Sequence, residues 1–286
     1  MTTKRNHRMV YPILSILIPC ILGIVGMVSK NVSILIWIQN LLVMLLLTPV
    51  CFFVSKKSLR LNDKAIVLLS AILLGLTFSG PNLEGVHRWL RVPFCTLNVA
   101  TIVLPITWVA LYRLIEEKQY AISIPGIMVI VFLLCFQPDA SQLLAFSIPV
   151  MVLMLRSSVS GIIKGSLCGV LLVLTLKSWI SLDTLQPVDY TEGILTMLQD
   201  ISIILYAVGI VSLFSIPVCF LIPCKEKSRG ICTGIAVYYW LMILSTFAGN
   251  FPVPFMGYGI SPILGFFAFL IWFVHDDKSY LQRESE

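Results

Sequence analysis

Ten long apolar stretches follow one another along the chain, and they constrain its fold more than any other feature. A transmembrane helix needs about 20 mostly apolar residues. A barrel strand would instead show alternating apolar and polar residues over about 10 positions. We therefore predict an all-α polytopic membrane protein whose single domain spans 1–286. Its ten helices are expected at approximately 9–28, 32–54, 65–79, 97–114, 121–136, 140–155, 162–176, 201–221, 231–248 and 260–274.

Composition agrees with a bilayer environment. Hydrophobic residues make up 58% of the chain and charged residues 12%, against roughly 45–50% and about 25% in soluble proteins. The net charge of +6 does not indicate a nucleic-acid partner, because the basic residues lie at the ends of the apolar stretches. The eight cysteines form no Cys-x-x-Cys pair, so we interpret them as apolar packing residues and expect no metal site.

The distribution of basic residues predicts the orientation of the chain. With the N-terminus in the cytoplasm, sixteen of the 20 lysines and arginines fall on the inner side. The inner group includes Lys56, Lys57 and Arg60, and the four on the outer side are Lys30, Arg88, Arg91 and Lys177. Cytoplasmic loops of membrane proteins are enriched in lysine and arginine. The bias supports ten spans with both termini in the cytoplasm.

The outer connection over residues 80–94 carries two arginines against this tendency. Guanidinium groups bind phosphate in a forked geometry, and Trp89 suits the lipid–water boundary. One interpretation is a site in which Arg88 and Arg91 bind an anionic lipid headgroup. The alternative is an interfacial anchor that touches ordinary phospholipid.

Acidic residues mark two further outer connections. Asp139 follows Gln137 and Pro138, and it is expected either to cap the next helix or to face a polar cavity. The connection over residues 177–193 contains Asp183, Asp189 and Glu192, which are also common residue types at a helix start. Asp200 follows among apolar residues, and we expect a buried acid there to face the bundle interior.

The last outer connection, over residues 249–262, cannot be a continuous helix. Prolines and glycines are concentrated in it, and both interrupt helices. We predict a re-entrant or broken-helix element that lines a cavity and contains Tyr258 and Ser261.

Together these connections resemble the SEDS family of membrane proteins, of the FtsW/RodA/SpoVE type. The resemblance depends on an ordered set of motifs along essentially the whole chain. They are Gly85-Val-His-Arg88-Trp89-Leu90, Gln137-Pro138-Asp139 and the series Pro252, Pro254, Phe255, Tyr258, Gly259 and Ser261. The resemblance implies ten spans, a cytoplasmic N-terminus and a location in the bacterial cytoplasmic membrane.

The resemblance also implies an activity. The family polymerises lipid II, an undecaprenyl-pyrophosphate-linked disaccharide, into peptidoglycan during elongation, division or sporulation, beside a class B penicillin-binding protein. Asp189 matches the family's catalytic position, and Asp183 is a second candidate. The implied substrate-binding residues are Arg88, Arg91, Trp89, Asp139, Tyr258 and Ser261. A divalent cation shared by the acids is left open.

Glycosyl transfer from a polyprenyl pyrophosphate is consistent with these residue types. A carboxylate accepts the proton of the acceptor hydroxyl, which typically contributes 10²–10⁴-fold in rate. Positive charge stabilises the departing pyrophosphate. We therefore expect Asp189 to act as the base and the two arginines to hold the diphosphate.

Two other functions stay open. A non-catalytic scaffold of the cell-wall machinery is favoured by a shortened outer loop before Asp189. It is also favoured by Met197 and Leu198, which stand where the family has a glutamate pair. A transporter of lipid-linked precursors would need polar residues through the full membrane depth, whereas the placed polar residues cluster at the outer face.

Overall fold

The computed structural model describes residues 2–54, 62–93 and 95–283, with side chains from residue 9 to residue 275 in these ranges. Lys56, Lys57 and Arg60, counted above as inner basic residues, lie outside them. The elements are α1 (Thr2–Ser29), α2 (Ile34–Val54), α3 (Asp63–Leu76), η1 (Thr77–Ser79), β1 (Trp89–Val92), β2 (Cys95–Asn98), α4 (Val99–Glu116), α5 (Tyr120–Phe136), α6 (Ala140–Arg156), α7 (Gly161–Ile180), α8 (Ile194–Ile201), α9 (Ile203–Ser215), α10 (Val218–Leu221), η2 (Glu226–Ser228), α11 (Arg229–Ser245) and α12 (Ser261–Arg283).

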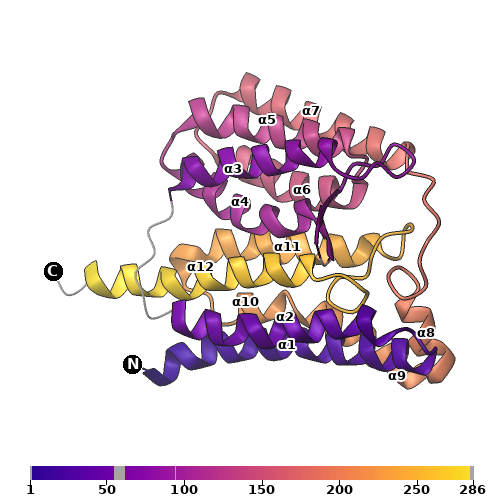
Figure 1. Cartoon of the computed structure of the whole chain (residues 1–286). Helices are drawn as coiled ribbons and strands as arrows, with labels where there is room; N and C mark the ends of the chain where they lie inside the picture. Colours follow the sequence, from indigo (N-terminus) through magenta and orange to yellow (C-terminus); the bar gives the residue numbers. More distant parts are fainter. Residues whose placement is uncertain (1, 55–61, 94, 284–286) are drawn as a thin grey trace. The chain divides into compact units, whose positions relative to one another are not determined.

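The mostly helical prediction is confirmed (Figure 1). Within the described residues, five segments are long and apolar enough to cross a membrane, namely Met9–Ser29, α2, α4, α7 and Ile203–Leu221. Apolar side chains on these helices are widely exposed, as at Leu35, which is 72% exposed, and Ile162, which is 84% exposed. Such surfaces suit lipid rather than water, so the chain is a multi-pass membrane protein. The count of ten spans and the cytoplasmic termini stay predictions.

The helix boundaries follow from capping side chains. The side chain of Asn62 accepts hydrogen bonds from backbone N–H groups at the start of α3, and Asn98 does the same for α4. Asp139 caps α6, and Ser202 caps α9. Each cap satisfies a donor that the first turn of a helix leaves free.

The predicted span over residues 201–221 is divided in the structure. Ser202 is extended, with φ −166° and ψ 136°, and it separates α8 from α9. Pro217 then lies between α9 and α10. Proline lacks the N–H that a continuous helix would use, and its ring clashes with the preceding turn.

The chain forms two compact units. The first unit comprises Met1–Arg60, Pro187–Glu226 and Ile243–Glu286. In it α1 contacts α2, α8, α9, α10 and α12. The aromatic ring of Phe220 is fully buried, with its centroid 4.8 Å from that of Phe269 and 5.2 Å from that of Phe266. These rings pack α10 against α12.

The second unit comprises Leu61–Gln186 and Lys227–Met242. Its central helix is α4, which contacts α3, α5 and α6 and is buried over most of its length. The indole N–H of Trp108 on α4 donates to the carbonyl of Ile231 at 2.9 Å and so joins α4 to α11. Our prediction of a single domain over the whole chain stays a prediction.

Candidate functional site

The connection that carries both arginines, predicted to lie on the outer side, forms a β-hairpin, which we did not predict. Strand β1 pairs antiparallel with β2, with Trp89 opposite Asn98 and Arg91 opposite Thr96. Arg91 is exposed on β1, whereas Arg88, just before the strand, is buried. The hairpin therefore places the two guanidinium groups in different environments.

Arg88 is held by groups of its own unit. Its Nη2 atom donates to the carbonyl of Pro138 and to the carboxylate of Asp183, and its Nε atom lies 3.8 Å from Oδ2 of Asp139. The three side chains of Arg88, Asp139 and Asp183 are 6%, 4% and 12% exposed. One guanidinium thus faces two carboxylates. We call the side chains of Arg88, Asp139 and Asp183 the Arg88 cluster.

Asp139 both caps a helix and belongs to the Arg88 cluster. Its Oδ1 atom accepts the backbone N–H of Gln142 at 3.3 Å, which confirms the expected cap of α6. Burial raises the pKa of Asp139, and the charge of Asp183 adds to this shift, whereas Arg88 and hydrogen bonds from Gln142 and Asn98 oppose it. A raised pKa fits a cluster in which one positive charge serves two acids.

Gln137 and Gln142 extend the polar contacts beneath the hairpin. The side-chain amide of Gln137 donates to the carbonyl of Leu74 at 2.9 Å and to the hydroxyl of Thr77 at 2.8 Å. The hydroxyl of Tyr238 donates to Oε1 of Gln142 at 2.6 Å. These bonds tie Gln137 of the Gln-Pro-Asp segment to the end of α3 and η1, and Gln142 on α6 to α11.

The segment that follows α7 is anchored to the hairpin connection. Asp183 bonds Arg88 and accepts the backbone N–H of Leu185 at 3.2 Å. The hydroxyl of Thr184 donates to the carboxylate of Glu84 at 3.1 Å. Asp183 is therefore an acid with its partners inside the second unit.

Asp189, in the first unit, has a different environment. Its side chain is exposed, and no hydrogen bond or ion pair is found for its carboxylate within the described residues. The nearby Glu192 carboxylate accepts the backbone N–H of Val188 at 2.8 Å and so stabilises the turn that presents Asp189. An exposed, unpaired carboxylate is free to approach a hydroxyl group.

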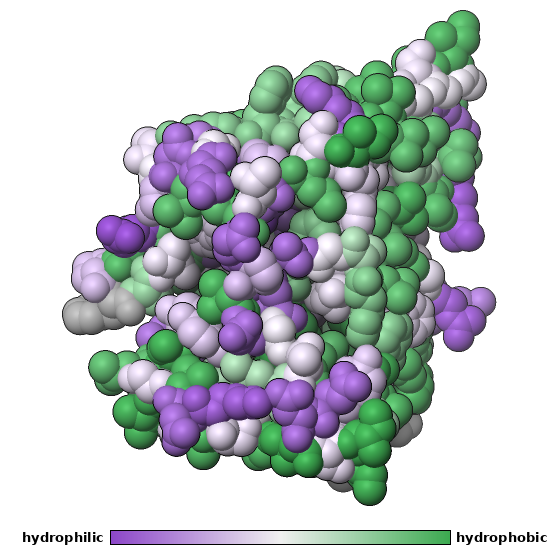
Figure 2. All heavy atoms as spheres, turned by 90° about the vertical axis from the view of Figure 1, so that its right-hand side faces the viewer, coloured by the Kyte–Doolittle hydropathy of each residue, from purple (hydrophilic) through white to green (hydrophobic). Residues whose placement is uncertain are grey.

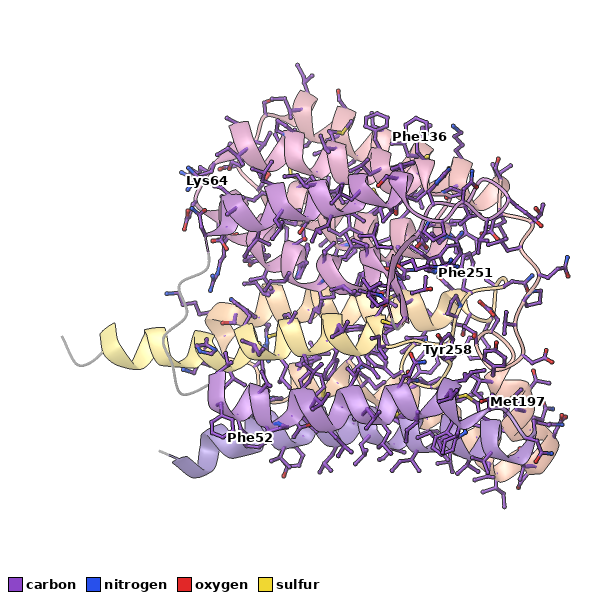
Figure 3. All side chains as sticks on the ribbon, in the orientation of Figure 1. Phe52, Lys64, Phe136, Met197, Phe251 and Tyr258 are labelled. Atoms are coloured by element: carbon purple, nitrogen blue, oxygen red, sulfur yellow. The ribbon has the colours of Figure 1, made fainter. Side chains whose placement is uncertain are left out.

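The residues after Asp189 contact the loop that precedes α12. The backbone N–H of Tyr258 donates to the carbonyl of Tyr190 at 2.9 Å, and the N–H of Val253 donates to the carbonyl of Thr191 at 3.2 Å. The rings of Tyr190 and Tyr258 meet edge to face, with centroids 5.9 Å apart. Figure 3 labels Tyr258 on this loop.

Residues 249–260 are non-helical, as predicted for the connection over residues 249–262, whereas Ser261 begins α12 as a buried residue. Sequence reasoning missed the residue that binds this loop from α2. Asn40 bonds the backbone of Gly257 and of Gly259. The only sequence signal for it is an amide inside an apolar run.

Asp200 is not the buried acid that we predicted. It lies on α8 with its side chain 52% exposed, and its carboxylate is 2.6 Å from the ammonium group of Lys30. The expectation was wrong because α8 is a separate short helix, so Asp200 does not enter the apolar part of a long span. The pair lies at the surface of the first unit.

Hydrophilic side chains gather on the face that Figure 2 shows, among hydrophobic ones. Within the part of the chain that the structure describes, no group of three or more His, Cys, Asp or Glu side chains could hold a metal ion. The acids and arginines singled out in the sequence thus fall in both units, with Asp189 in the first and the Arg88 cluster and exposed Arg91 in the second.

Solved structures with a similar fold are known. A point-mutant form of the rod shape determining protein RodA from Thermus thermophilus matches with a TM-score of 0.71 and 16% identity, over 94% of this chain and 96% of that one. The chain has a RodA-like fold. A second crystal structure of that RodA matches with a TM-score of 0.59 and 17% identity over the same shares. No family model and no curated protein matches the sequence, so the RodA-like chain is divergent.

Proposed function

We propose that this chain is a SEDS-type peptidoglycan glycosyltransferase of the bacterial cytoplasmic membrane, which polymerises lipid II into glycan strands. The observation that carries the proposal is the exposed, unpaired carboxylate of Asp189, followed directly by the Tyr190–Tyr258 contact. This carboxylate lies at the chain position that the motif resemblance assigns to the base. The RodA-like fold over 94% of the chain supports the same assignment.

In the proposed reaction, Asp189 accepts the proton of the acceptor sugar hydroxyl. The hydroxyl oxygen forms a bond to the anomeric carbon of the donor, and the bond from that carbon to pyrophosphate breaks with its electron pair. The polyprenyl pyrophosphate leaves as an anion and needs no general acid. Positive charge held near the leaving oxygens lowers the barrier.

The two arginines receive different roles in this proposal. Arg91 is exposed on β1, so we assign it the direct contact with diphosphate. Arg88 is occupied by Asp183 and by the carbonyl of Pro138, so we assign it the support of the hairpin that carries Arg91 and Trp89.

A non-catalytic scaffold is the second candidate, and one observation favours it. A guanidinium already bound to internal acceptors offers little to a substrate phosphate, and Arg88 is such a group. A scaffold of this kind would bind a class B penicillin-binding protein through its helices without forming glycan.

Polymerisation of fluorescent lipid II by the purified protein distinguishes the candidates. The protein is reconstituted in liposomes with and without a class B penicillin-binding protein whose own activity is blocked, in the presence of Mg²⁺ and with a chelator. The glycosyltransferase predicts a ladder of glycan products on a gel. Stable binding of the partner without any ladder would favour the scaffold, and transfer of lipid II between leaflets without a ladder would favour a transporter.

A further inference from the structure

Asn40 is a buried amide within a largely apolar helix. It lies on α2 and is 1% exposed. A buried amide costs free energy unless both its donor and its acceptor find partners. The position of its hydrogen-bond partners therefore indicates which part of the first unit this side chain stabilises.

Both halves of the Asn40 amide bond the loop before α12. Its Nδ2 atom donates to the carbonyl of Gly257 at 2.9 Å, and its Oδ1 atom accepts the N–H of Gly259 at 3.3 Å. These two backbone groups lie on either side of Tyr258. One contact needs a donor and the other an acceptor, so a carboxamide satisfies both while a carboxylate or an alkyl side chain does not.

The backbone of this loop needs support from outside. Phe255 has φ 66° and Gly259 has φ 133°, and L residues rarely adopt such values. Glycine adopts such a φ without strain, so the strain lies at Phe255, two residues before the first bond from Asn40 at Gly257. Loss of these bonds would let the loop relax toward other conformations.

Tyr258 connects the loop that Asn40 bonds to the segment that carries the proposed base. Its N–H bonds the carbonyl of Tyr190 at 2.9 Å, and the two rings pack edge to face. Tyr190 directly follows Asp189. A chain of contacts within the first unit therefore runs from α2 to the backbone beside the carboxylate.

We propose that Asn40 is a positioning residue that fixes Tyr258 and, through Tyr190, the backbone next to Asp189. The role of Asp189 as a base rests on the proposed function. The effect of Asn40 on the loop does not rest on it, so the two claims can fail separately.

Hydrogen exchange of residues 252–261 in detergent micelles tests the effect on the loop. In the wild-type protein we expect the Gly259 amide to be protected. In Asn40→Leu we expect exchange to be about tenfold faster, because the bonds that hold the segment are lost. Gln39→Leu is the matched control, since Gln39 donates to the carbonyl of Leu35 in its own helix at 2.8 Å, and it should exchange like the wild type.

Asn40→Asp is a second, nearly isosteric variant in case the leucine variant does not fold. Burial at this position disfavours the charged form of the introduced carboxyl group, so at a pH high enough to ionise it the carboxylate cannot donate to Gly257, and exchange should again be faster than in the wild type. Acidification should restore part of the protection relative to Asn40→Leu, because a protonated acid regains a donor. A change of volume alone would give no such recovery.

Polymerisation separates this claim from the proposed function. We expect Asn40→Leu to lower turnover about tenfold with a smaller change in KM, because orientation rather than binding is lost. A wild-type protein without polymerase activity would remove the proposed function, while hydrogen exchange would still decide the role of Asn40. An unprotected Gly259 amide in the wild type, or unchanged exchange in both Asn40 variants, would overturn the positioning role.

Discussion

Arg88 and Asp183 form a buried ion pair although 95 residues separate them in the sequence. The pair joins the start of the hairpin to the segment after α7, and Asp139 is the second acid beside the same guanidinium. Removing the arginine would leave two buried carboxylates without their counter-charge.

We expect Arg88→Met to destabilise the protein by about 3–5 kcal/mol, the usual cost of breaking a buried charge pair from one side. Arg91→Met should change stability by no more than about 0.5 kcal/mol, because Arg91 is exposed and surface substitutions have small effects. Thermal unfolding in detergent measures both. Equal small shifts in the two variants would show that the Arg88 cluster does not hold the hairpin.

Asp139 should make stability depend on pH. Its pKa is raised above the ordinary value of 3.8, chiefly by burial. A raised pKa in the folded state gives a stabilisation that is fully present below about pH 4 and is lost as the pH rises through the folded pKa. We therefore expect the Tm of the wild type to fall relative to that of Asp139→Asn as the pH rises from about 4 toward 8.

Asparagine is a fair replacement in this experiment because it also caps helices. Asp200→Asn is the control, since Asp200 lies at the surface beside Lys30. A wild-type Tm that rises relative to Asp139→Asn with increasing pH would contradict the raised pKa.

Two glycine substitutions should have opposite signs. A Cβ atom at Gly257 would lie 2.5 Å from the carbonyl oxygen of Thr191, so Gly257→Ala should cost about 1–3 kcal/mol. A Cβ at Gly165 on α7 would meet nothing within 4 Å, so Gly165→Ala should stabilise by about 0.5–1 kcal/mol through helix propensity. Thermal unfolding of the two variants measures the difference. A neutral Gly257→Ala would mean that the loop does not approach Thr191 this closely.

Arg91 should contribute to binding through the geometry of its guanidinium. Arg91→Ala is expected to weaken binding of a polyprenyl pyrophosphate in nanodiscs by about tenfold, the scale of a lost hydrogen bond to a charged group. Arg91→Lys should lose less, because it keeps the charge but not the forked donors. Binding by Arg91→Lys as tight as that of the wild type would argue against forked recognition of phosphate, because lysine lacks the forked donors.

Some helix starts could be predicted closely because a capping residue precedes the apolar run. Asn98 and Asp139 both precede a helix and cap it, and both caps fall within two residues of the predicted boundaries. The predicted start at residue 201 lies within two residues of the start of α9, but the short helix α8 that precedes it was not predicted.

Side-chain partners were less predictable than the helices. Two arginines in one outer loop appeared equivalent in the sequence, yet the hairpin exposes Arg91 and buries Arg88. Arg88 precedes β1 and is buried against Asp139 and Asp183, whereas Arg91 lies on the strand, and a strand of four residues gives little sequence signal. Asn40 was missed for a related reason, because its partners lie more than 200 residues away, on Gly257 and Gly259.

Polymerisation of lipid II by Asp189→Asn tests the central claim most directly. Asp200→Asn is the control acid, and thermal unfolding checks that each variant is folded. The account predicts that Asp189→Asn lowers the rate at least about 100-fold, the low end of a general base's contribution, with an unchanged Tm, while Asp200→Asn polymerises like the wild type. Full polymerase activity in a folded Asp189→Asn protein would contradict it.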